Sequence, residues 1–179
     1  MNITDGSKVS AILRCQDKGQ ADDIKFMFNP KELSIQLSVE TSENPGARSQ
    51  RSGRPKISFS HLPPKIITIS NILFDTYETG EDVEDTYIQA FQKATQFIQD
   101  KERPPVYSFV WGKNYLEYCF VEAVNYKLTK FLADGKPVRA VIDSLTLKET
   151  EKPNDDKTSQ TSSTPDAKND NYKNRTKNR

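Results

Sequence analysis

Side chains able to carry catalytic chemistry are few and far apart in this sequence. His61 is the only histidine, and no serine, cysteine or carboxylate stands at an informative spacing from it, so a turn residue at the end of a strand is favoured over a general base. Cys119 lies in an apolar strand pattern typical of a small core residue, and Cys15 is chemically unremarkable. Phosphate-loop, Gly-x-Ser-x-Gly and His-Glu-x-x-His motifs are absent. We therefore expect no enzyme, no metal site and no cofactor.

An acidic stretch covers residues 75–85 and includes Asp75, Glu78, Glu81 and Asp82. Its carboxylates lack the Asp-x-Asp-x-Asp-Gly order that folds oxygens around one calcium ion. A solvated linker leading into the first turn of a helix is the favoured interpretation.

A basic stretch, residues 41–56, carries Arg48, Arg51, Arg54 and Lys56 but no large apolar residue, and we expect it to be a long loop between two strands. Loops of this length are uncommon in compact domains and are usually functional or mobile. Two interpretations stay open. The loop is either a mobile hairpin tip or a basic arm that docks on the acidic 75–85 surface of an identical or related subunit. In the second case, the inter-subunit contact consists of Arg48, Arg51, Arg54, Lys56, Asp75, Glu78, Glu81 and Asp82.

The elements that must position these residues are mostly strands. The clearest pattern is the alternation of Leu33, Ile35, Leu37 and Val39 with polar residues, which predicts a strand with one buried and one wet face. A shift of phase at 143–144 in the last strand predicts a β-bulge. The other expected strands are residues 9–13, 24–28, 57–59, 66–74, 106–111, 115–128 and 138–147.

One helix is predicted at about 83–101. Its apolar residues recur at helical spacing, and acidic residues stand in or near its first turn. The predicted buried face consists of Val83, Tyr87, Ile88, Phe91, Ala94, Phe97 and Ile98. The expected fold class is α+β, mainly antiparallel β, a barrel or sandwich with this single helix covering it.

Composition divides the chain into a domain, residues 1–150, and a polar tail, residues 151–179. Only 34% of the chain is hydrophobic, and the tail has no apolar residues except Ala167 and Tyr172. A segment of that kind cannot fold by itself. It is interpreted as a disordered, solubilising end or as a segment that binds a partner. The domain is nearly neutral, which argues against nucleic-acid binding, and the chain shows neither a membrane-spanning run nor a secretory signal, so synthesis in the cytoplasm is expected.

Several motifs, in this order along residues 8–149, resemble the tube-type domain of contractile injection systems, as found in the baseplate hub or adaptor protein of extracellular phage-tail-like particles. They are Phe28-Asn29-Pro30-Lys31-Glu32-Leu33, residues 63–74, Arg103-Pro104-Pro105-Val106-Tyr107-Ser108-Phe109-Val110-Trp111-Gly112, residues 123–131, and Gly135-Lys136-Pro137-Val138-Arg139-Ala140.

The resemblance implies a tail-tube-like fold without catalysis, a hexameric ring of identical subunits, and a place between the inner tube and the central VgrG-like spike, among other baseplate components. It also implies incorporation into a bacterial particle that is released or membrane-anchored. Typical relatives continue into a LysM domain, which the polar tail cannot form. Two alternatives remain: a repeated inner-tube subunit of the same machine, and a small-ligand-binding β-barrel. The tail after the last strand favours the hub adaptor over the tube subunit.

Overall fold

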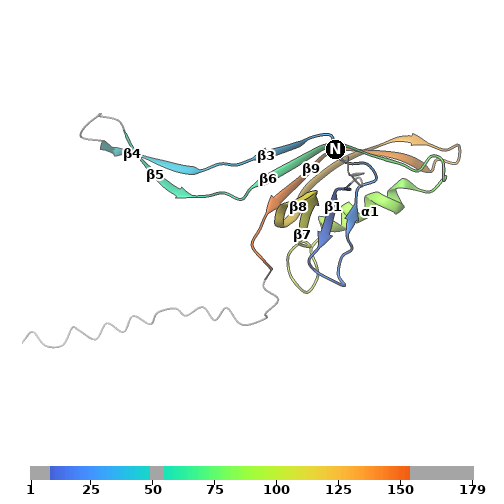
Figure 1. Cartoon of the computed structure of the whole chain (residues 1–179), viewed down its shortest axis with the longest axis horizontal. Coiled ribbons are helices and arrows are strands. Elements are labelled where there is room, and N and C mark those ends of the chain that lie inside the picture. Colours follow the sequence, from blue (N-terminus) through green and yellow to red (C-terminus); the bar gives the residue numbers. More distant parts are fainter. Residues whose placement is uncertain (1–8, 49–54, 154–179) are drawn as a thin grey trace, which may run out of the picture.

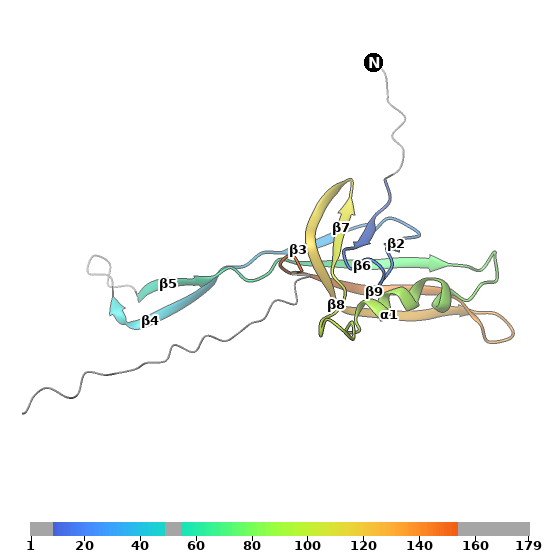
Figure 2. The same ribbon diagram turned by 90° about the horizontal axis from the view of Figure 1, so that it is seen from below.

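The computed structural model describes residues 9–48 and 55–153. Their strands form a seven-stranded antiparallel sheet and a separate two-stranded ribbon. The ribbon projects from the body of the molecule as a long arm, and one short helical segment covers the sheet (Figures 1 and 2). The predicted α+β class, mainly antiparallel β with a single helix, is confirmed.

The sheet has the strand order β2-β1-β7-β8-β9-β6-β3. It therefore has two edges, and the described strands close no barrel, as expected of a sandwich-like arrangement. The strands are β1 (Ile12–Cys15), β2 (Ile24–Lys25), β3 (Leu33–Gln36), β4 (Glu40–Arg48), β5 (Pro55–His61), β6 (Ile66–Asp75), β7 (Tyr107–Trp111), β8 (Lys113–Phe131) and β9 (Pro137–Glu149), and the helical segment is the π-helical turn η1 (Glu84–Ile88) followed directly by α1 (Gln89–Ala94).

Strand β8 belongs to both halves of the sheet. Its first part, from Lys113 to Cys119, pairs with β7, and its second part, from Cys119 to Phe131, pairs with β9. Figure 2 shows that β8 curves strongly on the way. The sheet bends with it and encloses the core together with the helical segment.

Aromatic rings at the centre of the core join the helix to both halves of the sheet. Phe91 of α1 is fully buried, and its ring contacts Phe74 of β6 and Phe26, with centroids 5.8 and 6.1 Å apart. Phe26 in turn contacts Phe109 of β7. Val83, Ile88 and Ala94 complete the buried side of the helical segment, as the helical periodicity predicted.

The bulge expected near residues 143–144 is confirmed. Buried residues of β9 change phase there, and the register with β8 shifts at Asn125 and Tyr126. Strand β6 changes phase at the same level, where Asn71 has a φ of 55°. Asparagine is one of the few non-glycine residues that tolerate this left-handed conformation. Two neighbouring strands thus bend together and keep their apolar residues on the inner face.

The helix is shorter than its periodicity predicted. It ends at Ala94 instead of about residue 101, and Phe97 is 71% exposed. The chain turns back where the Ile98 N–H donates to the Arg103 carbonyl at 2.8 Å. This turn presents Lys101 and Arg103 to the buried carboxylate of Asp17, a tertiary contact that apolar spacing does not reveal.

The prediction of a long loop at 41–56 is wrong. Most of this stretch forms the antiparallel pair β4–β5, and six strands therefore precede the helix instead of five. The register shifts between Asn44 and Arg48, around the Pro45-Gly46 step that suggested a loop. A two-stranded ribbon accommodates proline and glycine at such an irregularity because no third strand needs their backbone groups.

The buried face predicted for Leu33–Val39 is also wrong. Strand β3 ends at Gln36, and Ile35, Leu37 and Val39 are 45%, 75% and 54% exposed. At this point the chain leaves the edge of the sheet and enters the arm, so no second layer faces these side chains (Figure 1).

Candidate functional site

The predicted contact residues lie at opposite ends of the molecule. Arg48 ends β4 and Lys56 lies in β5, so both belong to the arm, whereas Arg51 and Arg54 lie outside the described residues. Residues 75–82 follow the far end of β6, away from the arm (Figure 2). Among the described residues, the structure therefore does not bring Arg48 or Lys56 close to the acidic residues within one chain.

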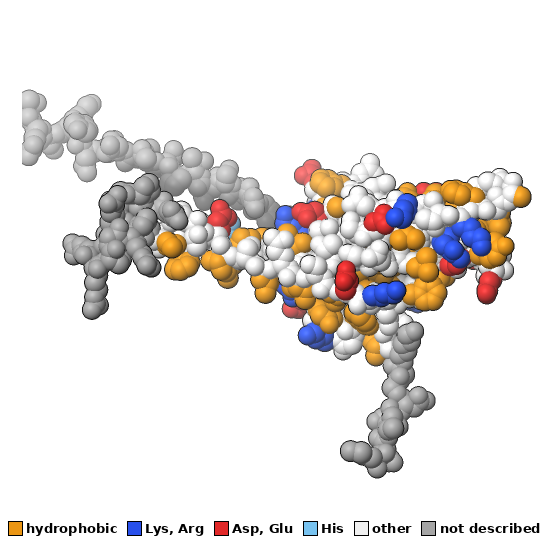
Figure 3. Space-filling view, turned by 90° about the horizontal axis from the view of Figure 1, so that it is seen from above, with side chains coloured by type: hydrophobic (Ala, Val, Ile, Leu, Met, Phe, Trp, Pro, Cys, Tyr) orange, Lys and Arg blue, Asp and Glu red, His pale blue; other side chains and the backbone are white. Residues whose placement is uncertain are grey.

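The arm carries an exposed apolar surface that sequence reasoning missed. We call it the arm surface and define it as Ile35, Leu37, Val39, Ile57, Phe59 and Leu62. Leu37, Phe59 and Leu62 are 75%, 79% and 77% exposed, and Figure 3 shows hydrophobic side chains following one another along one side of the arm. Contiguous apolar surface of this kind marks interaction sites. The sequence signal for part of this surface is the alternation of Leu33–Val39, which by itself predicts a strand face buried in the core.

A side-chain contact between His61 and Glu40 joins the two strands of the arm near the body. His61 ends β5, as its interpretation as a strand-end residue predicted, and lies opposite Glu40 of β4. Its Nε2 is 2.9 Å from the Glu40 Oε2. Both side chains are more than half exposed, so this pair positions the root of the arm but adds little stability.

Of the acidic residues, Asp75 is bound within its own chain. Its Oδ2 accepts hydrogen bonds from Arg139 Nε at 3.0 Å and Arg139 Nη2 at 2.6 Å. The Arg139 guanidinium, together with the Tyr77 N–H, lowers the pKa of Asp75 below its usual range. Asp75 therefore fixes the β6–β9 end of the sheet and is the least available of the four carboxylates for a partner.

The turn that follows is held by local hydrogen bonds. Thr76 Oγ1 donates to the Glu81 carbonyl at 2.6 Å, and Asp82 Oδ1 accepts from the Glu84 N–H at 2.8 Å, which caps the helical segment. Glu78 and Glu81 are exposed, and within the described part of the chain no ion pair holds either carboxylate. These two side chains are the acidic groups that the turn presents to solvent.

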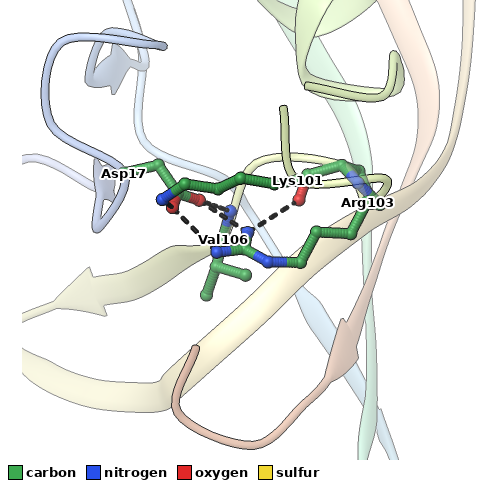
Figure 4. Close-up of polar contacts among 5 residues, drawn as sticks. Asp17, Lys101, Arg103 and Val106 are labelled. Carbon is green, nitrogen blue, oxygen red and sulfur yellow. Dashed lines mark hydrogen bonds and ion pairs between the residues drawn. The ribbon is translucent and has the colours of Figure 1, made fainter. Parts of the chain in front are cut away.

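A cluster of ionic contacts surrounds the buried carboxylate of Asp17 (Figure 4). Asp17 is 3% exposed and accepts hydrogen bonds from Lys101 Nζ at 2.7 Å, from Arg103 Nη1 and Nη2 at 2.8 and 2.9 Å, and from the Val106 N–H at 2.8 Å. Burial alone would raise the pKa of Asp17, but the hydrogen bonds from Arg103, Lys101 and Val106 outweigh it and hold this pKa well below its usual range. The cluster ties the turn after β1 to the chain between α1 and β7. Nothing in the local sequence around Asp17 pointed to it.

A groove of about 710 Å³ runs beside the helical segment. Its lining residues come from η1 and α1, from the turn at 20–22 and from the turn at 96–100, together with Pro105 and Tyr107. Three of its side chains are acidic and one is basic, and the exposed ring of Phe97 stands among them. We call it the helix groove.

The residues with possible nucleophilic or metal chemistry do not converge. Cys119 is fully buried, and burial raises the pKa of its thiol to about 12, which keeps it protonated. Within residues 9–48 and 55–153 no three His, Cys, Asp or Glu side chains are placed to share a metal ion. The same residues contain no helix with the length and hydropathy needed to cross a bilayer.

A family model described as "Contractile injection system tube protein" matches residues 8–158, which includes the whole sheet, the arm and the helical segment. No curated protein matches the chain.

Proposed function

The chain belongs to the contractile injection system tube protein family, and we propose that within such a machine it is a non-enzymatic subunit of the baseplate hub, in a hexameric ring that connects the inner tube to the central spike. Family membership itself means a structural role and assembly with other subunits of the particle. The proposed place in the hub ring, which is more specific than this general structural role, is supported by the arm and by the polar segment that follows β9.

The arm surface is the observation that carries the assembly role. Six exposed apolar side chains, which lie on β3, on β5 and on the segments that join the ribbon to the sheet, have no function in an isolated chain and favour association by burial. The arm and the 75–82 turn lie at opposite ends of the molecule, so a contact between them joins one copy to the next head to tail (Figure 2). Repetition of one such contact closes into a ring when the rotation between copies permits it.

Charge supports the same contact. Arg48, Arg51, Arg54 and Lys56 stand close together in the sequence of the arm, and Glu78 and Glu81 are the exposed carboxylates of the turn. We assign the basic residues to one side of the inter-subunit contact and Glu78 and Glu81 to the other side. We place Asp82 beside the two glutamates, whereas Asp75, which is bound to Arg139, supports the turn from within its own chain. Complementary charges of this kind set orientation and partner choice more than affinity.

A second candidate is a repeated inner-tube subunit, which the family's description as a tube protein favours. The two candidates differ in copy number and position. A hub subunit occurs as one ring at the spike end, whereas a tube subunit recurs along the full length of the particle.

Electron microscopy of purified particles, with an epitope tag placed after residue 153 and labelled by gold-coupled antibody, tests the assignment. Label at one end only supports the hub, and label along the tube supports the second candidate. Negative-stain images of the purified chain, alone and mixed with the inner-tube and spike proteins, show whether it forms six-fold rings. Failure to form any ring or to enter the particle contradicts both candidates.

A further inference from the structure

We propose that the helix groove binds a basic segment of the same chain, residues 173–179, and so holds the polar tail against the body. The proposal concerns a surface that the assembly contact described above does not use. It depends on the charge of the groove, on its exposed aromatic ring, and on the sequence and tether of the tail.

The groove presents an excess of negative charge. Asp22, Asp85 and Asp100 line it, and Lys93 is the only cation among its lining residues. All three carboxylates are exposed, and in the described part of the chain neither Asp22 nor Asp100 has an ion-pair partner, while Asp85 accepts only the Gln89 side-chain amide at 2.6 Å. These carboxylates come from three separate segments, which the fold brings to one concave surface.

The groove also exposes an aromatic ring that the core does not use. Because α1 ends at Ala94, Phe97 lies on the turn that follows, 71% exposed and among the acidic side chains. An aromatic face next to carboxylates suits a ligand that combines cations with flat or apolar groups, since Arg and Lys bind both.

The tail contains one segment with this chemistry. Residues 173–179 read Lys-Asn-Arg-Thr-Lys-Asn-Arg, with four cations, no acidic residue and Tyr172 directly before them. In an extended peptide, alternate side chains point to the same side, so this order places all four cations along one edge at intervals of about 6.6 Å. The rest of the tail mixes Lys with Asp and Glu and lacks such an edge.

Because the basic segment is tethered to the body, a low intrinsic affinity is sufficient for it to occupy the groove. Residues 154–172 connect the last described residue, Pro153, to the basic segment, and a linker of this size gives the segment an effective concentration of about 1 mM near its own body. An intrinsic Kd of about 1 mM, which a few exposed ion pairs can supply, then leaves the groove occupied about half of the time. Half occupancy halves the rate of cleavage and a Kd of about 0.25 mM would lower it fivefold, so the expected protection of the bound segment is about two- to fivefold.

Limited trypsin digestion of the full chain, followed by mass spectrometry, tests the proposal. Trypsin cuts after Lys173, Arg175 and Lys177 within the bound segment, and after Lys157 and Lys168 outside it. We compare the wild type with the variant D22N/D85N/D100N, bond by bond, so that local sequence preferences cancel. Cleavage after residues 173, 175 and 177 should be two- to fivefold faster in the variant, whereas cleavage after residues 157 and 168 should be unchanged.

Three further measurements define the outcome. In 0.5 M NaCl the wild type should lose its protection, because screening weakens contacts between exposed charges, and Phe97→Ser should reproduce part of the loss at low salt. Protection should not depend on protein concentration. Equal cleavage in wild type and variant overturns the proposal, and so does protection that appears only at high protein concentration, which would place the segment in another copy. Circular dichroism checks that both variants fold.

Discussion

The ring of Phe91 meets the ring of Phe74 edge to face, with centroids 5.8 Å apart and an angle of 63° between the planes. This contact attaches the short helix to β6, the strand that continues from the arm. A helical segment this short has little stability of its own, so it is ordered by packing. The Gln92 amide and Glu84 carboxylate, which both bind the Tyr126 hydroxyl, orient it on β8.

Replacing Phe91 by Ala should lower the free energy of unfolding by about 3–5 kcal/mol, because the side chain is fully buried and its loss leaves a cavity among aromatic rings. A urea titration followed by tryptophan fluorescence or circular dichroism measures the change. Phe97→Ala, at an exposed position of the turn after the same helix, serves as the control and should change stability by less than about 0.5 kcal/mol. Wild-type stability in the Phe91 variant would contradict the core described above.

Asp17→Asn should destabilise the protein by about 3 kcal/mol at pH 7, because it removes the charge that Arg103 and Lys101 bind. The pKa of Asp17 is lower in the folded than in the unfolded state, so its contribution is fully present above about pH 5 and is lost as the pH falls toward the folded value. The stability difference between wild type and variant should therefore narrow in acid. Urea titrations from pH 7 to pH 3 measure it, with the exposed Asp22→Asn as control; a constant difference would rule out this linkage.

Truncation after Pro153 should leave the melting temperature within a few degrees of that of the full chain. Strand β9 ends at Glu149, and its last contacts with the body include the Thr150 N–H, which donates to the Tyr118 carbonyl at 3.0 Å. Contact of a tethered, exposed segment adds little to stability. A differential scanning calorimetry trace shows the result, and a drop of ten degrees would mean that the tail packs into the fold.

The double variant Leu37→Ser and Phe59→Ser should fold normally and fail to assemble. Both side chains are at least three-quarters exposed, so the free energy of unfolding should change by less than about 1 kcal/mol. Co-sedimentation with the inner-tube and spike proteins should drop at least tenfold. Phe28→Ser, at an exposed apolar position outside both the arm surface and the helix groove, is the control. Normal incorporation of the double variant would remove the arm surface from the assembly contact.

Substituting Arg48, Arg51 and Arg54 with Ser should likewise spare folding and weaken assembly, but with a different salt response. The wild-type contact should weaken as salt shortens the Debye length to about 8 Å and below, whereas an apolar contact persists. Sedimentation at 50 mM and 500 mM NaCl separates the two contributions. Full incorporation of the folded triple variant at both salts would leave the apolar side chains as the whole of the contact.

The sequence predicted the elements that obey one simple periodicity and are buried by their own chain. The paired strands after the helix, the bulge at 143–144 and the apolar positions from Val83 to Ala94 are of this kind. Alternation predicts that a face is covered but not what covers it. Leu37 and Val39 alternate as a core strand does, yet they are exposed because no other part of the described chain packs against them.

Two other features depend on contacts between residues distant in sequence. The end of the helix at Ala94 follows from the turn that carries Lys101 and Arg103 to Asp17, more than eighty residues away. The pairing of β4 with β5 follows from backbone hydrogen bonds along a stretch whose proline and glycine favoured a loop. Local patterns contain no information on either partner, so the helix end and the arm could not be predicted from them.

Both strands of the arm continue into the sheet as neighbours, because β3 leads into β4, β5 leads into β6, and β3 pairs with β6 from Leu33↔Ile69 to Gln36↔Ile66. A pull on the arm along its length therefore acts parallel to β6, whose partner β9 is hydrogen-bonded to it over nearly its whole extent. In this direction the hydrogen bonds are loaded in shear and must break together, whereas a sideways pull would open them one at a time. The arm is thus attached in the geometry that best resists a pull along its length. This suits a particle whose parts are driven past one another by force.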